Sequence, residues 1–212
     1  MPMDPETFEQ LLIGLISGLV GAVVGVIFGH ILTIRIYKQR ANSLELGFYS
    51  ELELISNYFK SWLRNLNEEY LKPNRPSYSG FTEVDMTCID ALTIELVSVN
   101  KLLTKDQREL ILNLKSKFLI IKSTDRQRDD NSQFNESNGC FYINTACSAR
   151  MIIDVIEVIW YLNKLIESKN YFRIDESDSW ENKAKEVFLL SGIDFNSNTW
   201  KTISIHIPQD NK

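Results

Sequence analysis

An uncharged apolar run near the N-terminus constrains this chain more than any other feature. From Leu11 to Ile34 the sequence holds no Asp, Glu, Lys or Arg, and its polar residues are Ser17, His30 and Thr33. A helix needs about 20 apolar residues to cross a bilayer core, whereas runs of about 10–14 are more typical of helices buried in soluble proteins. We therefore expect residues 11–34 to form a single transmembrane helix.

The ten residues before this run are acidic. They include Asp4, Glu6 and Glu9 but no Lys or Arg, whereas a secretory signal peptide starts with a basic segment and has an apolar core of only about 7–15 residues. We therefore expect an uncleaved anchor. Residues 1–10 should form a short extracytoplasmic tail that Pro2 and Pro5 keep out of the helix.

Five of the nine glycines lie inside the apolar run, at steps of four, three, four and four residues. At about 100° per residue they fall within an arc of roughly 80° on one side of a helix. Glycine is common in membrane helices, but a face of this kind also lets two helices approach closely. The pattern predicts a homo-oligomer, either a dimer or a ring around a narrow hydrophobic pore. The residues are Gly14, Gly18, Gly21, Gly25 and Gly29.

The charges predict which side of the membrane each part occupies. Every Lys and Arg lies after the run, beginning with Arg35, Lys38 and Arg40. Basic segments stay on the cytoplasmic side, so we expect the tail outside and residues 35–212 in the cytoplasm, with the chain in the inner (cytoplasmic) membrane. These three residues and His30 would lie at the membrane interface. A pH-sensitive gate is the alternative role for His30.

Composition excludes several classes of protein. Without the three tail acids, 25 acidic residues face 23 basic ones, which argues against a general nucleic-acid-binding surface. Cys88, Cys140 and Cys147 form no CxxC pair and have no histidine cluster nearby. We expect them to be small buried groups in a reducing compartment, with no metal and no cofactor bound.

The residues after the run predict an all-α domain of four to five helices. Apolar residues at helical spacing continue from Ala41 to Tyr70 and stop before Pro73. This helix can extend the transmembrane segment as one rod or bend near Gly47. In a dimer, we expect its apolar seam to continue the pairing that the glycines begin.

Further helices are expected at about 84–103, 104–122 and 141–168. The second of these starts at Thr104, which forms a capping box with Gln107. The third is apolar on most of its circumference, so it should lie at the centre of the domain.

The C-terminal part is less regular. A short helix is expected at about 180–191, capped by Ser179 and ended by Gly192. Ile203, Ile205 and Ile207 alternate with polar residues and predict a short strand-like segment. Residues 129–139 are polar and predict an exposed loop, either a partner-binding site or a disordered segment.

Motifs for catalysis are absent from the sequence, so we expect that the chain is not an enzyme. No Gly-x-Ser-x-Gly, phosphate-binding loop or cysteine–histidine pair is present. Helical antiviral ribonucleases of the HEPN class use an Arg, four to six residues and then a His. Lys201 and His206 are similar in spacing, but Lys replaces the Arg and the segment has strand periodicity. A membrane-anchored ribonuclease is the least favoured hypothesis.

Other polar and aromatic groups are interpreted as structural. Pairs such as Glu68-Glu69 and Asp129-Asp130 predict solvated faces. Arg150 and Asp154 lie one helical turn apart and predict a surface ion pair. Asp154 and Glu157 predict a solvent-facing strip, with a polar pocket as the alternative. Four aromatic residues predict core packing, with a small-molecule pocket as the alternative: Phe59, Trp62, Trp160 and Tyr161.

Two main functions fit these features. The first is a membrane effector: an oligomer whose cytosolic domain senses a protein or signal ligand and alters membrane permeability. The second is a non-catalytic scaffold that tethers a cytosolic partner to the bilayer. The plan of one span and a helical cytosolic domain resembles accessory membrane proteins of RNA-guided antiviral immunity that carry degenerate HEPN-like bundles. That resemblance implies a role in antiphage defence.

Overall fold

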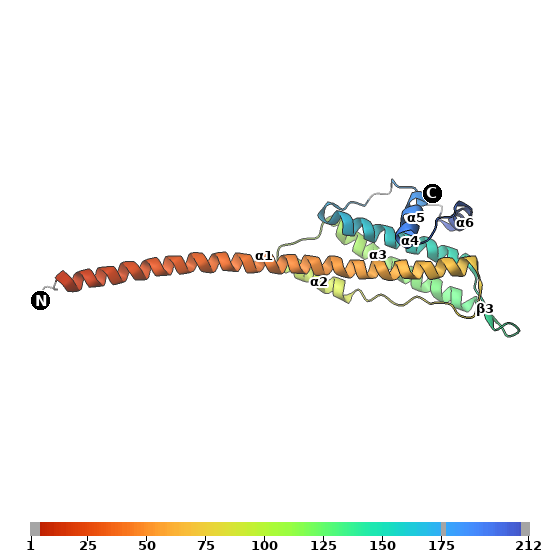
Figure 1. Ribbon diagram of the computed structural model, residues 1–212, viewed down its shortest axis with the longest axis horizontal. Coiled ribbons are helices and arrows are strands. Elements are labelled where there is room, and N and C mark those ends of the chain that lie inside the picture. Colours follow the sequence, from red (N-terminus) through yellow and green to blue (C-terminus); the bar gives the residue numbers. More distant parts are fainter. Residues whose placement is uncertain (1–4, 175–176, 209–212) are drawn as a thin grey trace.

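One helix dominates the computed structural model, which describes residues 5–174 and 177–208. Helix α1 (Pro5–Leu71) is unbroken over 67 residues. Figure 1 shows its N-terminal half projecting from a helical bundle as an isolated, gently curved rod. We call residues 5–40 the rod and residues 41–208 the bundle. Helix α1 continues through Gly47 without interruption, so the rod and the first helix of the bundle are a single element.

The helix begins earlier than expected. Pro5 is its first residue, so the expectation that Pro5 would keep residues 5–10 out of the helix was wrong. Proline is compatible with the first helical position because the amide hydrogen that it lacks would have no intrahelical partner there. Residues 1–4 of the expected tail, including Pro2, lie outside the described residues.

The second half of α1 forms one wall of the bundle. Its helix-spaced apolar residues face the core, as expected, and α1 ends at Leu71 before Pro73. The same core is shared by side chains from every other helix of the bundle. The buried apolar residues of α1 are Ala41, Phe48, Tyr49, Leu52, Ile55, Phe59, Trp62, Leu63 and Leu66, with Leu44 and Tyr70 partly buried against them.

Three further helices complete the main body: α2 (Thr87–Ser98), α3 (Lys105–Asp130) and α4 (Thr145–Ser168). The capping box at the start of α3 is confirmed, because the Thr104 hydroxyl accepts from the Gln107 amide and the Gln107 side chain accepts from the Thr104 amide. Helix α3 extends eight residues beyond the expected end at 122. Its inward positions there are Asp125 and Arg128, so the apolar periodicity stops although the helix continues.

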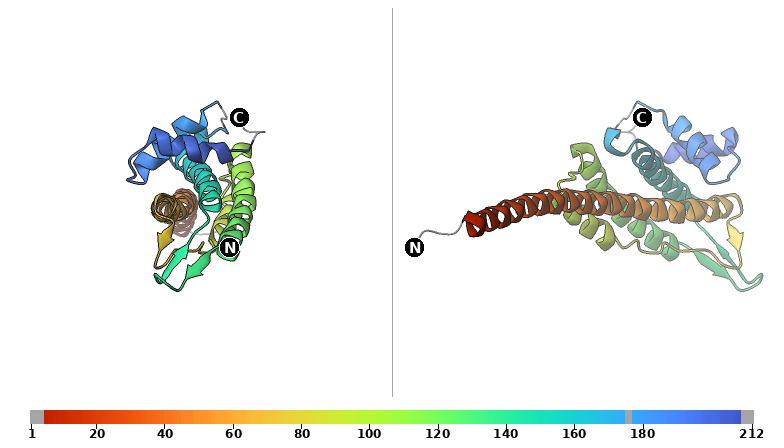
Figure 2. Two further views of the ribbon diagram at one scale, coloured as in Figure 1. Left: turned by 90° about the vertical axis from the view of Figure 1, so that its right-hand side faces the viewer. Right: turned by 60° about the vertical axis from the view of Figure 1, so that its left-hand side comes forward.

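Helix α4 lies at the centre of the bundle, as its apolar circumference predicted. It packs against α1, α3 and α5 (Trp180–Leu190), and the end-on view in Figure 2 shows it enclosed by these helices. Fourteen of its 24 residues are buried. The described residues form six α-helices in all, so the fold is a mostly helical bundle with one long apolar N-terminal helix.

The expected C-terminal strand is instead helical. Residues Ser197–Ile203 form α6 and Ser204–His206 form a 3-10 turn, η2. The Asn196 side chain accepts hydrogen bonds from the amides of Asn198 and Thr199, which starts the helix. Trp200, Ile203 and Ile207 are buried at helical spacing, while Ile205 is 70% exposed. The Asn196 cap and the helical spacing of Trp200, Ile203 and Ile207 therefore outweigh the strand-like alternation of Ile203, Ile205 and Ile207.

A small sheet closes the end of the bundle opposite the rod. Strands β1 (Asn74–Arg75), β2 (Gln133–Asn135) and β3 (Cys140–Tyr142) are antiparallel in the order β1-β3-β2. Part of the segment expected to be a loop, 129–139, is thus a hairpin with Asn135 paired to Cys140. Gly139 takes a positive φ of 65° in its turn. The hairpin residues are largely exposed, as expected.

Candidate functional site

The glycine face of the rod is bare. A Cβ atom added at any of the five glycines would meet no atom of the chain within 4 Å. Every residue from 13 to 40 is exposed, and the most apolar 18-residue stretch of α1 is wholly unburied. Helix α1 is long and apolar enough to cross a bilayer. Oligomerisation through the glycines remains a prediction.

The bundle lies on the opposite side of α1 from the glycine face. At about 100° per residue, the centre of the glycine arc is roughly 150° from the centre of the buried seam. The bundle therefore does not obstruct an approach to the glycines. The seam itself is filled by the chain's own helices, so the expectation that it would continue a pairing between copies was wrong.

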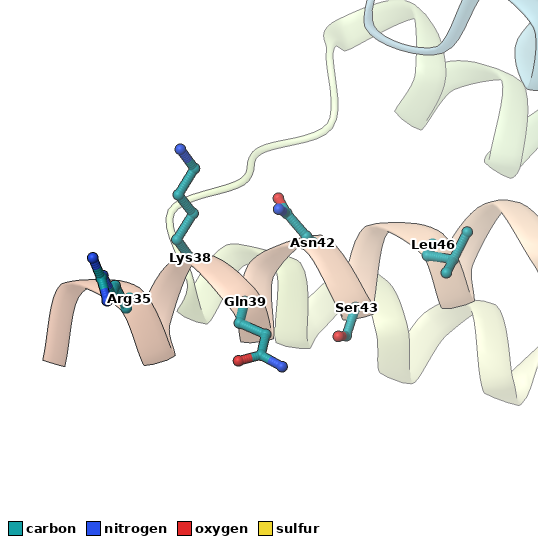
Figure 3. Close-up of a pocket in the computed structure, with 6 residues that line it drawn as sticks. All are labelled: Arg35, Lys38, Gln39, Asn42, Ser43 and Leu46. Carbon is teal, nitrogen blue, oxygen red and sulfur yellow. The ribbon is translucent and has the colours of Figure 1, made fainter. Parts of the chain in front are cut away.

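The basic residues that follow the apolar run differ in their partners. Arg40 forms an ion pair with Glu95 of α2, with 2.7 Å between Nη2 and Oε2. Among the described residues, Arg35 and Lys38 form no ion pair. They line a shallow groove of about 390 Å³ together with Gln39, Asn42, Ser43 and Leu46. Figure 3 shows Arg35, Lys38 and Asn42 projecting along one edge of the helix. His30 is exposed on the rod.

Glu157 lines a polar pocket between α3 and α4, and Asp154 shares the Lys117 ammonium group with Glu157. Lys117 of α3 lies 3.1 Å from the Asp154 carboxylate and 2.6 Å from that of Glu157. Glu157 and Lys117 also line a cavity of about 150 Å³ that reaches Tyr161. The expectation of a solvent-facing strip was therefore wrong. The expected ion pair of Asp154 with Arg150 is replaced by the pair with Lys117, because α3 supplies a cation at this interface.

Asp154 and Glu157 share the ammonium group of Lys117, and the pKa values of Asp154 and Lys117 are shifted. Burial raises the pKa of Asp154 more than Lys117 lowers it. Burial also lowers the pKa of Lys117, but the carboxylates of Asp154 and Glu157 outweigh that effect and raise it overall. The ionised form of Asp154 is therefore less favourable in the folded chain than in the unfolded one.

Asp154 should give the folding stability a measurable pH dependence. Because its folded pKa is raised, its stabilising contribution is complete below the ordinary value of 3.8 and is lost as pH rises through the folded pKa. The free energy of unfolding of Asp154→Asn, relative to the unmodified chain, should therefore be higher at pH 7 than at pH 3. Urea titration of the detergent-solubilised chain at both pH values measures this. Asp130→Asn, at an exposed position, is the control, and an equal difference at both pH values would contradict the prediction.

A buried ion cluster joins α1, α3 and the segment 76–86, which we call the strap. Arg128 is fully buried and lies 2.7 Å from both Glu69 and Asp125. Each charged group also bonds to the strap backbone: Arg128 donates to the Ser79 carbonyl, the Ser79 amide donates to Glu69, and the Phe81 amide donates to Asp125. Glu69 was expected to be solvated, but it is 1% exposed.

The cluster satisfies the polar backbone of a segment that has no regular structure. Buried amide and carbonyl groups need partners, and the strap has no neighbouring strand or helical turn to supply them. Tyr78 places its ring 5.0 Å from the Arg128 guanidinium. The arrangement is a structural clasp. Sequence reasoning missed it because its three parts, around Glu69, the strap and Asp125 with Arg128, lie about 10 to 60 residues apart and follow no apolar pattern.

The remaining predicted residues have the following positions. Cys147 is buried, Cys140 is half-buried and Cys88 is exposed. The expectation of buried cysteines is therefore confirmed for Cys147 and wrong for the other two. Lys201 lies on α6 and His206 on η2. Within the described ranges, no three His, Cys, Asp or Glu side chains are placed to hold a metal ion.

The four aromatic residues expected in the core are packed there or at its edge. Phe59 stacks on Phe118 of α3, with 5.2 Å between ring centroids. Trp160 and Tyr161 meet edge to face, and the ammonium group of Lys183 lies 4.4 Å from the Trp160 ring. Trp62 is buried beside Phe59. The core interpretation is therefore confirmed, and Tyr161 additionally lines the polar pocket.

Comparison with known proteins gives no relative: no family model, curated protein or solved structure matches this chain.

Proposed function

We propose that this chain is a single-pass membrane protein that self-assembles through the glycine face of α1 and acts as a membrane effector. Its bundle lies in the cytoplasm, responds to a protein or signal ligand, and changes the permeability of the bilayer through the assembled rods. A membrane-tethered scaffold is the alternative, and the experiment below separates the two. Catalysis plays no part in the proposed role.

The observation that carries the proposal is the division of α1 into two halves with opposite environments. Residues 13–34 of the rod carry no charged side chain and are exposed on all sides, and the glycines among them touch nothing. The other half of the same helix is buried against the bundle. An exposed apolar surface of this extent is costly in water, and a bilayer together with a second rod removes that cost.

The continuity of α1 supports a mechanical link between the bundle and the membrane. No proline lies between residues 6 and 72, and the helix is unbroken from Pro5 to Leu71. Sharp kinks in helices arise mainly at proline, at Gly/Ser pairs or at bulges, and α1 passes through its one adjacent pair of this kind, Ser17-Gly18, without a break. A rotation or tilt of α1 within the bundle would therefore be carried along the rod to the glycine face.

Overproduction of the full chain in bacterial cells should depolarise the cytoplasmic membrane, because a high concentration of the chain drives assembly of the rods by mass action without the ligand. A potential-sensitive dye measures the loss of potential, and the Gly21→Leu, Gly25→Leu chain should leave the potential unchanged because the rods no longer assemble. Carbonate extraction of the same cells tests membrane insertion independently. A chain that resists extraction and is dimeric, yet leaves the potential unchanged when overproduced, would contradict the effector and support the scaffold.

A further inference from the structure

The end of the bundle from which the rod leaves, which we call the near end, is built by two short segments that close over α1. One is the loop between α2 and α3, residues 99–104, and the other is η1 (Lys169–Tyr171). Lys101 pairs with Glu45 of α1 and donates to the Asn42 side chain at 3.2 Å. Gln107 donates to the Lys169 carbonyl at 2.9 Å. Asn170 of η1 donates to Glu45 of α1 at 3.5 Å, so both segments lie against α1 just beyond the base of the rod.

Large apolar side chains at the near end point into solvent. Leu102 is 66% exposed in the loop and Tyr171 is 89% exposed in η1. Val97, at the last turn of α2, is 54% exposed. Single exposed apolar residues are ordinary on protein surfaces. Three on the segments that surround the rod are consistent with a surface that contacts the membrane interface.

Among the described residues, those of the near end that form no ion pair carry more positive than negative charge. Three acids there are paired: Glu45 with Lys101, Glu95 with Arg40, and Asp106 with Arg173. Five cations form no ion pair among the described residues, against two acids, Glu109 and Glu167. These cations are Arg35, Lys38, Lys105, Arg108 and Lys169, the last lying 5.5 Å from the Tyr49 ring. The surface is therefore complementary to anionic phosphate.

The height of the near end above the apolar run fits contact with headgroups. Asn42 and Glu45 lie about 12–16 Å beyond Ile34 along α1. The polar layer of a bilayer is about 5–7 Å thick on each side. An ordinary helix tilt of about 20° toward the bundle lowers a segment packed about 10 Å off the axis by about 3 Å. The remaining gap is about 2–8 Å at Asn42 and Glu45, which Lys and Arg side chains can span. It is about 12–15 Å at Tyr49, beside which Lys169 lies, so Lys169 reaches the headgroups only when the helix tilt is near the upper end of the observed range, about 40°.

We propose that the near end binds the anionic headgroup layer of the membrane that α1 crosses. Arg35 and Lys38 contact lipid phosphates from the base of the rod. Lys105, Arg108 and Lys169 contact them from the bundle, while Leu102 and Tyr171 enter the interface. The bundle is thereby held against the membrane in one orientation. This inference rests on the proposed function, because it requires α1 to span the bilayer.

Hydrogen exchange of the full chain in nanodiscs tests this contact. Amides of residues 98–105 and 168–173 should exchange about tenfold more slowly in discs that contain phosphatidylglycerol than in discs of phosphatidylcholine alone. Raising the salt concentration should reduce this protection, because screening weakens surface electrostatics. The triple variant Lys105→Gln, Arg108→Gln, Lys169→Gln should remove the difference between the two compositions.

A matched control removes the same charge from the opposite end of the bundle. Arg64, Lys72 and Arg126 are exposed, and their replacement by Gln should leave the protection unchanged. Equal exchange of these amides in both disc compositions would overturn the inference. This includes the case in which the amides are protected equally in both compositions and only the variant Leu102→Ser, Tyr171→Ser loses the protection, because the contact would then be apolar and not electrostatic. A chain that does not insert into discs would instead contradict the proposed function, so the two failures are distinguishable.

Discussion

A chain carrying Gly21→Leu and Gly25→Leu is expected to purify as a single copy of 24.6 kDa, whereas the unmodified chain purifies as an oligomer. Glycine permits close backbone contact between membrane helices, and two leucines on this face would hold the rods apart. Because a Cβ at either position meets no atom of the chain itself, the substitutions should not disturb the fold of one copy. Sedimentation in detergent measures the mass, and circular dichroism measures retained helix.

A control is needed to show that the position of the added side chains on α1 matters, and not only their volume. Val23→Phe with Ile27→Phe adds a similar number of carbon atoms on the side of α1 away from the glycines, about 150–180° around the helix. This control should keep the oligomer. The replacement of the same two glycines by Ala should weaken the oligomer only partly, because a methyl group still permits a close approach. If the leucine variant has the same mass as the unmodified chain, the prediction that the rods pack through the glycine face is wrong.

The largest expected effect on folding is at the buried clasp. Arg128→Met should lower the free energy of unfolding by about 3–5 kcal/mol, because it leaves Glu69 and Asp125 without their cation in the interior. Arg128 is 0% and Glu69 1% exposed, and their charged atoms are 2.7 Å apart. A loss of this size is a large part of the stability of an ordinary domain. Urea unfolding in detergent, followed by tryptophan fluorescence, measures it.

Lys122→Met provides the matched control. Lys122 lies on the same helix and pairs with Glu83 of the same strap, but these side chains are 33% and 70% exposed. An exposed pair of this kind contributes about 0–1 kcal/mol. The double variant Arg128→Met, Glu69→Gln should recover part of the loss, because it removes both buried charges of that pair. An equal decrease in the free energy of unfolding for Arg128→Met and Lys122→Met would contradict the prediction that the buried clasp stabilises the fold.

Most helices were predicted well where apolar residues repeat at helical spacing, but α2 covers Thr87–Ser98 instead of the expected 84–103. The seam from Ala41 to Tyr70, the capping box at Thr104 and the central position of α4 all follow from local pattern. Prediction failed where two patterns compete, as at Ile203 to Ile207, where a capped helix prevailed over strand-like alternation. It also failed where a buried face is charged, as at Arg128, because hydrophobic periodicity gives no signal there.

For the candidate site too, some features follow from the sequence and others depend on tertiary packing. The uncharged run, the arc of five glycines and the basic residues after them are fixed by composition and spacing, since side-chain direction in a helix depends only on position in the chain. Which side of α1 the bundle occupies was decided by packing. So were the burial of the seam, the sharing of Lys117 by Asp154 and Glu157, and the closure of the strap by Glu69 and Arg128. These features bring together residues distant in sequence, and only the folded chain determines which of them meet.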